Sequence, residues 1–268
     1  MAVAVQEPWR APGIEVGEYL CTLGPADRSF EEQHCGTCVA FVRAGGFAYR
    51  SALGSASLGA GAVLLGNAGH AYTCAHHVPG GDRCLSFIYA PEIVDEVAGA
   101  AGVRREFARP SLPASTDFAA LPALAASAIA GRGPSLEELA YEVLARALAA
   151  DAGRPIPQPP ASEQRRALES MRFIDERAAE PLTLRRVAAQ ARLSPFHFLR
   201  AFRRSAGTTP HQYLLAARVR RAAALLLETD LPVTEVAGQA GFGDLSNFIR
   251  TFRRGTGLSP RAFRKRRR

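Results

Sequence analysis

The sequence lacks any apolar run long enough to cross a membrane. Its longest weakly polar stretch, residues 121–130, falls well short of the roughly 20 apolar residues that a spanning helix needs. The N-terminal residues carry neither a basic leader nor a long apolar core, so we expect no secretory signal. These absences predict a cytoplasmic protein with no membrane partner.

Catalytic signatures are also missing. The chain contains no His-x-His metal motif, no phosphate-binding glycine loop, no dinucleotide fingerprint and no Ser-His-Asp motif. The absence of these motifs predicts that the protein is not an enzyme.

Its five cysteines are an odd number, which favours reduced thiols over a disulfide framework.

Charge is distributed unevenly along the 268 residues. Lysine is absent from residues 1–162, where 11 arginines stand against 16 acidic residues, a balance of −5. Residues 163–268 hold 22 basic residues against 9 acidic ones, a balance of +13, and the two parts sum to the net +8. An acidic first part and a strongly basic second part predict a polyanionic partner for the second part alone.

Turn residues and apolar periodicity divide the chain further. Short apolar runs separated by glycine-rich turns over residues 14–90 predict strands of a small barrel or sandwich. Helical spacing follows over 91–101 and 135–150, where Ser135 and Glu138 predict a capping box. Four prolines within 155–160 then predict a semi-rigid linker, because proline disfavours both helix and inner strand.

The basic part repeats itself at an offset of 49 to 50 residues. Residues 198–204 read Phe-Leu-Arg-Ala-Phe-Arg-Arg and residues 248–254 read Phe-Ile-Arg-Thr-Phe-Arg-Arg, and each segment is followed by Gly-x-x-Pro. A segment of small residues precedes each copy at 187–191 and 236–240. Such self-similarity indicates a duplicated structural unit.

Each copy has the pattern of a helix-turn-helix. Ser194 and Asp244 are suited to cap the second helix, because their oxygens accept from free backbone N–H groups. The two phenylalanines of each copy, four residues apart, share one helix face and predict its core side. The longest uninterrupted helical segment of this part is predicted over about 210–229, between the two copies.

The opposite helix faces predict contacts to DNA. Arginine bonds guanine and asparagine bonds adenine in the major groove, and an apolar ring suits the thymine methyl. The predicted base-reading residues are Phe196, His197, Arg200, Ser246, Asn247 and Arg250. Other basic residues suit phosphates, which supply affinity without sequence choice. These are Arg203, Arg204, Arg253, Arg254, Arg264 and Lys265, with the rest of the run that ends at Arg268.

Two other interpretations of the basic part are a helical bundle with solvated arginines and an architectural DNA protein. The duplicated turn, the matched basic faces and the charge of +13 together favour sequence-specific DNA binding over the bundle. The long acidic first part disfavours a purely architectural role, because packing DNA does not need such a domain.

Over about residues 165–267 the sequence resembles the AraC/XylS family of bacterial transcription regulators. The motifs that carry the resemblance are Leu-Ser-x3-Phe-x-Arg-x-Phe-Arg at 193–203, and Ala-Gly-x-x-Gly-Phe-x-Asp-x-Ser-x-Phe-x-Arg-x-Phe-Arg at 237–253. The resemblance implies an all-α tandem helix-turn-helix of seven helices. It places Leu199 at a base-reading position where the family often has a polar residue.

The first part resembles the family's sensory domain more loosely, mainly at 59–67 and 81–87. The full prediction is an α+β two-domain protein. A cupin-like β-barrel with trailing helices spans 1–151, a Pro-rich linker 152–162 and the DNA-binding domain 163–268. The resemblance implies a small effector, RNA polymerase and a second copy as partners. The helix at 135–150 either forms the dimer surface or packs on its own barrel.

Cysteine and histidine are concentrated between Cys21 and Cys84. The cluster predicts either a divalent-metal site or an oxidant-sensing thiol of low pKa. Its candidate residues are His34, Cys35, Cys38, Cys74, His76, His77 and Cys84. Against a chelate, residues three apart in a strand point to opposite faces. Against any special role, buried cysteines are often plain core residues. The alternative of another class is a cupin-type metal-dependent enzyme fused to a DNA-binding module.

Overall fold

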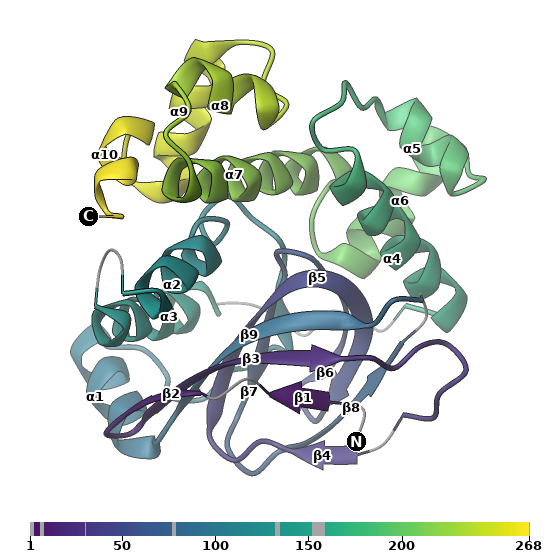
Figure 1. The fold of residues 1–268 in the computed structure, drawn as a ribbon. Helices are drawn as coiled ribbons and strands as arrows, with labels where there is room; N and C mark the ends of the chain where they lie inside the picture. Colours follow the sequence, from purple (N-terminus) through teal and green to yellow (C-terminus); the bar gives the residue numbers. More distant parts are fainter. Residues whose placement is uncertain are drawn as a thin grey trace.

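The structure is a computed structural model that describes residues 3–5, 8–29, 31–76, 79–131, 135–151 and 159–267. His77, Arg268 and most of the predicted linker therefore lie outside the described residues. The fold is α+β, as predicted, with strands in the first part of the chain and helices in the second (Figure 1). The strands are β1 (Val3–Val5), β2 (Trp9–Ala11), β3 (Ile14–Cys21), β4 (Glu31–Gln33), β5 (Thr37–Ser51), β6 (Gly54–Gly59), β7 (Val63–Gly66), β8 (Ala71–Ala75), β9 (Asp82–Tyr89) and β10 (Ser111–Leu112).

Strand β5 organises the sheets because it belongs to both. Its first part pairs antiparallel with β9 and β7, and β9 pairs in turn with β3 along eight residues. The register shifts between Val42 and Ala44, and the second part of β5 pairs with β6 and β8. Such a shift bends a strand, so β5 turns from one sheet into the other and the two sheets enclose an interior.

Alternate residues of β5 serve two different cores. Val39 and Phe41 pack with Phe87 beneath the helices. Cys38 and Ala40 face the opposite way, into the interior between the sheets. Because both faces of the strand are buried, its sequence is almost continuously apolar, as expected for a strand covered on two sides.

Three helices share one hydrophobic core with this sheet: α1 (Pro91–Ala101), α2 (Leu121–Ile129) and α3 (Leu136–Ala150). Helix α3 contacts β5, and both α1 and α2 contact α3. Helix α1 has the predicted bounds, with Pro91 in its first turn. The predicted capping box at Ser135 is wrong. Ser135 occupies the N-cap position, but its side chain makes no cap hydrogen bond.

The apolar face of α3 is used within the chain. Leu139, Val143 and Leu144 are buried in the same core as Phe41 and Phe87. Of the two interpretations of the helix at 135–150, the structure shows packing on the chain's own sheet. The apolar face of α3, the surface considered for a dimer contact, is therefore already buried within the chain.

The helices of the second part are α4 (Ala161–Glu176), α5 (Leu184–Gln190), α6 (Pro195–Ala206), α7 (Pro210–Glu228), α8 (Val233–Gln239), α9 (Leu245–Thr256) and α10 (Pro260–Lys265). Helix α4 begins two residues before the predicted start of the DNA-binding domain at 163. The structure confirms both predicted N-caps: Ser194 Oγ accepts from the backbone N–H of His197, and the Asp244 carboxylate accepts from that of Asn247. The four repeat phenylalanines are buried, which confirms the predicted core faces.

The turns between α5 and α6 and between α8 and α9 each contain a residue with a positive φ, but the residue type differs. Gly241 adopts a positive φ of 92° between α8 and α9. Its counterpart 49 positions earlier, Arg192, adopts a φ of 55°, a conformation that costs a non-glycine residue about 1–2 kcal/mol. A Cβ on Gly241 would lie 2.5 Å from the carbonyl oxygen of Ala178. The second turn therefore requires glycine for space as well as for backbone freedom.

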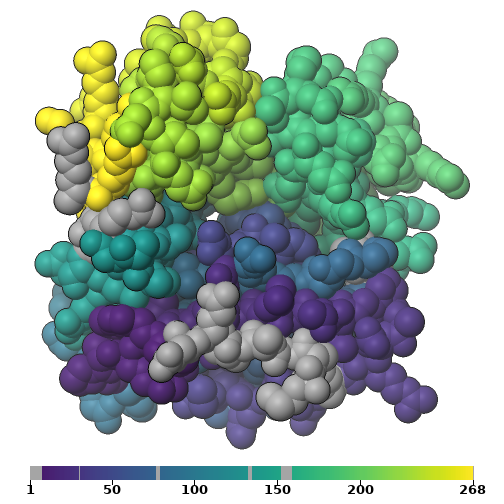
Figure 2. Space-filling view, viewed as in Figure 1, coloured from purple at the N-terminus to yellow at the C-terminus, as the bar shows by residue number. Residues whose placement is uncertain are grey.

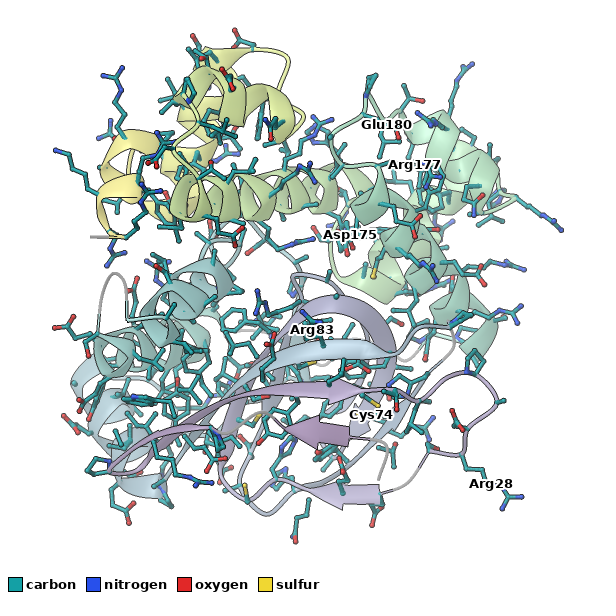
Figure 3. All side chains as sticks on the ribbon, viewed as in Figure 1. Arg28, Cys74, Arg83, Asp175, Arg177 and Glu180 are labelled. Carbon is teal, nitrogen blue, oxygen red and sulfur yellow. The ribbon has the colours of Figure 1, made fainter. Side chains whose placement is uncertain are left out.

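The helical part is packed directly on the sheets (Figure 2). Tyr213 and Arg220, both from α7, bond the two oxygens of the Asp175 carboxylate at 2.7 Å each. The guanidinium of Arg220 also lies against Gly61 of the β6–β7 turn. Figure 3 shows Asp175 at this boundary between helices and sheets. None of the helices in the described part of the chain has the length and apolar content needed to cross a membrane.

Candidate nucleic-acid interface and sheet cavity

The outer face of α6 presents the three residues predicted to read bases there. Phe196 is 64% exposed, and the guanidinium carbon of Arg200 lies 5.8 Å from the centre of its ring. His197 is exposed, and a hydrogen bond of 2.8 Å joins its Nδ1 to Ser194 Oγ. The cap of the helix thus also holds the imidazole at the helix N-terminus, next to an exposed ring and a cation.

Helix α9 repeats this arrangement 50 residues later. Ser246, Asn247 and Arg250 are exposed at the positions that correspond to Phe196, His197 and Arg200. Thr251 Oγ1 donates to Asn247 Oδ1 at 3.4 Å, which restrains the Asn247 amide. Each helix therefore carries an arginine one turn from its exposed N-terminal residues. The side chain four residues before that arginine is the apolar Phe196 on α6 and the polar Ser246 on α9.

The predicted phosphate-binding residues fall into two groups. The first group is exposed and consists of Arg203, Arg253, Arg254 and Lys265. The second group is engaged within the chain: Arg204 pairs with Glu163, and Arg264 is half-buried and donates to the carbonyl of Leu231. Since α10 lies against α7, Arg264 reaches the turn after α7. Its placement suits an internal contact better than the phosphate contact that its position in a basic run predicted.

The two basic faces stand on one scaffold. Helix α7 contacts α4 and α6 at one end of the repeat and α8, α9 and α10 at the other (Figure 1). Large buried residues on α7, such as Tyr213 and Leu226, join it to both copies. Two outward basic helix ends fixed to a common helix can contact one extended polyanion at two places.

A cavity of about 490 Å³ lies between the sheets of the first part. All five cysteines line it, together with His34 and His76; Figure 3 shows Cys74 among the strands. The structure thus brings together the predicted metal or redox residues that it describes. Cys35 precedes β5 in a bend and Cys38 lies within the strand, so the two thiols reach the same cavity without being strand residues of opposite face.

Three of the thiols in this cavity, those of Cys38, Cys74 and Cys84, are poorly suited to sensing oxidants. Burial raises the pKa of Cys38 to about 12, and it also raises the pKa values of Cys74 and Cys84. A reactive thiol needs the reverse shift, since the thiolate is the nucleophile. The low-pKa thiol predicted as one of two alternatives is therefore not found at these three residues.

The two cavity histidines have different partners. His34 stacks on Tyr72 with ring centres 4.2 Å apart and is hydrogen-bonded to Tyr49 Oη through Nε2 at 2.9 Å. Burial lowers the pKa of His34 to about 4, so its ring is neutral near pH 7. His76 instead lies 2.6 Å from a carboxylate oxygen of Asp82 through Nε2, and both side chains are buried.

Sequence reasoning missed two members of this cluster, Cys21 and Asp82. One ligand atom each from Cys21, His76 and Asp82 lies within 4.8 Å of the others. Cys21 ends β3 and Asp82 begins β9, and the two are register partners. Since they are 61 positions apart, only the strand register, which the sequence did not reveal, could have paired them.

Comparison with known proteins finds sequences and a structure that are similar to the helical repeat. A helix-turn-helix domain model matches residues 187–266. The melibiose operon regulatory protein of Escherichia coli strain K12 is 36% identical over 93 residues, 35% of this chain and 31% of that protein. The transcriptional activator RhaS of Salmonella schwarzengrund strain CVM19633 is 38% identical over 95 residues, 35% and 34% of the two chains. A similar solved structure is the DNA-binding domain of AdpA in complex with a target DNA. It is 37% identical with a TM-score of 0.36, and the match covers 37% of this chain and 88% of that one. The chain spans about a third of the length of these two curated relatives.

Proposed function

We propose that this chain is a sequence-specific DNA-binding transcription regulator. The premise is that residues 187–266, which match a helix-turn-helix domain model, form a domain of the AraC type, as the resemblance predicted. The observation that carries the proposal is the pair of matched, exposed, basic faces on α6 and α9, both fixed to α7. The relatives are transcription regulators, which favours a non-enzymatic role over a cupin-type enzyme.

In the proposed complex the N-terminal ends of α6 and α9 enter successive major grooves on one side of the duplex. Arg200 and Arg250 bond guanine edges, Asn247 bonds adenine, and Phe196 covers a thymine methyl. His197 and Ser246 complete the two base-reading faces. The exposed cations Arg203, Arg253, Arg254 and Lys265 contact phosphates, and Arg204 joins them when it leaves Glu163.

The first part, residues 1–151, acts in this proposal as a cupin-like sensory domain whose cavity receives a small effector or a metal ion. Residues 152–162 link it to the DNA-binding domain over 163–268. Occupancy of the cavity shifts the protein between states that differ in domain contacts, and hence in DNA occupancy or contact with RNA polymerase. A role as an activator is supported by the name of the relative RhaS. A second copy of the chain binds in this proposal on a surface other than the apolar face of α3, which is buried within the chain.

Selection of duplexes from a random library tests the proposal. The purified full-length chain is expected to enrich a shared sequence with two short conserved blocks, because each helix end reads one group of base pairs. Binding to the enriched duplex should exceed binding to a scrambled one by about 10³-fold or more at physiological salt. Enrichment of no shared sequence, with uniform salt-sensitive binding to every duplex, would reduce the protein to a non-specific polyanion binder.

A further inference from the structure

We propose that the sheet cavity contains a binding site for a thiophilic divalent metal ion, of the chemical class of Zn²⁺, formed by Cys21, His76 and Asp82. The three residues come from three strand ends: the last residue of β3, the residue after β8 and the first residue of β9. One ligand atom from each lies within 4.8 Å of the other two. No other group of three such ligands was found among the described residues.

The donor set selects the class of ion. A thiolate, an imidazole and a carboxylate are the ligands that Zn²⁺ takes in proteins. Mg²⁺ and Ca²⁺ prefer sites made of oxygen alone, so the sulfur and nitrogen donors disfavour them. Three protein ligands leave the fourth position of a tetrahedron for water or for a further sulfur. Cys84 is adjacent, with its Sγ 3.5 Å from Asp82 Oδ1.

The surroundings favour a metal site over a simple buried hydrogen bond between His76 and Asp82. The His76 and Asp82 side chains are only 4% and 7% exposed, and the Asp82 oxygens contact His76 on one side and Cys84 on the other. A hydrogen bond alone requires no sulfur, yet Cys21, Cys74 and Cys84 all line the same cavity. When the ion binds, it takes the place of the thiol proton of Cys21, so binding releases a proton and strengthens as pH rises.

The segment that carries Asp82 also contacts the helical part. Its neighbour Gly81 is packed so closely that an added Cβ would lie 2.0 Å from the carbonyl oxygen of Cys21. Two residues earlier, the carbonyl of Pro79 accepts from the Arg172 guanidinium of α4 at 3.3 Å. An ion bound by both Cys21 and Asp82 therefore fixes a segment that touches α4, and α4 packs on the first basic helix, α6. This consequence rests on the proposed function and makes the ion a candidate effector of DNA binding.

Titration with Co²⁺ tests the site, because Co²⁺ occupies zinc sites and its bonds to thiolate absorb light. The reduced, metal-free, full-length chain is expected to develop a thiolate-to-Co²⁺ charge-transfer band at a stoichiometry of one, and Zn²⁺ is expected to abolish it. Cys21→Ser should weaken Co²⁺ binding by about tenfold or more, since even residues that only orient a ligand contribute that much. Asp82→Asn should weaken it similarly.

Cys35→Ser is the matched control, because Cys35 lines the same cavity but lies outside the three-residue cluster. This variant should bind Co²⁺ like the unmodified chain. Comparison of metal-free melting curves separates loss of a ligand from loss of the fold. Absence of the band, or a band lost in Cys35→Ser and kept in folded Cys21→Ser, overturns the site.

The same samples test the consequence for DNA. Zn²⁺ is expected to change the Kd of the unmodified chain for its enriched duplex and to leave the Kd of Cys21→Ser unchanged. Equal affinity of the unmodified chain with and without Zn²⁺ overturns the link to α4. The Co²⁺ titration contains no DNA, so its failure leaves the regulator proposal standing. Failure of duplex selection, in turn, leaves the metal titration valid.

Discussion

Replacing Arg250 by lysine separates base reading from charge. Lysine keeps the positive charge on α9 but loses the planar fork that bonds guanine at two atoms. Arg250 is exposed, so the substitution should change the free energy of unfolding by no more than about 0.5 kcal/mol. Loss of one bidentate contact should cost about 1–3 kcal/mol on the enriched duplex, or about 5- to 150-fold in Kd.

Fluorescence anisotropy on two labelled duplexes measures this effect. One duplex carries the enriched sequence, and the other carries a changed base pair at the position that Arg250 reads. Arg250→Lys should weaken binding to the first duplex and leave binding to the second almost unchanged, so that base choice at that position is relaxed. An equal loss on both duplexes, or no loss on either, would refute a base-reading role for Arg250.

Arg253→Ala is the matched comparison on the same helix, because Arg253 is predicted to contact phosphate. Its removal should weaken both duplexes alike and make the plot of log affinity against log salt shallower by about 0.9. If Arg253→Ala altered base choice while Arg250→Lys altered only the salt dependence, the two roles would have to be exchanged.

Three further predictions concern the fold. Phe252→Ala should lower the free energy of unfolding by about 3–5 kcal/mol, because Phe252 is 0% exposed. Phe196→Ala should change the free energy of unfolding by no more than about 0.5 kcal/mol. Urea unfolding compares the two variants, and equal losses would contradict the assigned buried and exposed helix faces. Gly241→Ala should cost at least about 1 kcal/mol because of its positive φ, while Gly243→Ala, with open space at its Cβ, serves as the control that should cost less. As pH falls from about 6.5 towards 4, His34 becomes protonated in the unfolded chain but stays neutral in the folded protein, because burial lowers its pKa to about 4. The free energy of unfolding should therefore fall by up to about 3 kcal/mol over this range. His34→Gln should flatten this pH profile, and an unchanged slope would mean that other groups cause it.

Local features of the helical part could be predicted from sequence because they depend on a few neighbouring residues. The caps at Ser194 and Asp244 and the buried pair Phe248 and Phe252 follow from spacing within one helix. The same reasoning failed at Ser135, where the residue occupies the cap position without making the hydrogen bond. Residue type alone does not decide which way a side chain turns at a helix end.

Features that join distant segments could not be predicted. The cluster of Cys21, His76 and Asp82 depends on the register between β3 and β9, and no spacing in the sequence encodes that register. The contact between Arg220 and Asp175 depends in the same way on how α7 packs against α4. Charge composition placed Arg264 among the phosphate-binding residues, yet packing of α10 turned it inward.

Hydroxyl-radical footprinting of the enriched duplex is the most direct test of the central claim, which is that α6 and α9 read one DNA together. The account predicts two protected stretches on one side of the duplex, about one helical turn of 10–10.5 base pairs apart. Arg200→Ala should weaken protection chiefly at one stretch and Arg250→Ala chiefly at the other. A single protected stretch that responds equally to both substitutions would contradict the account.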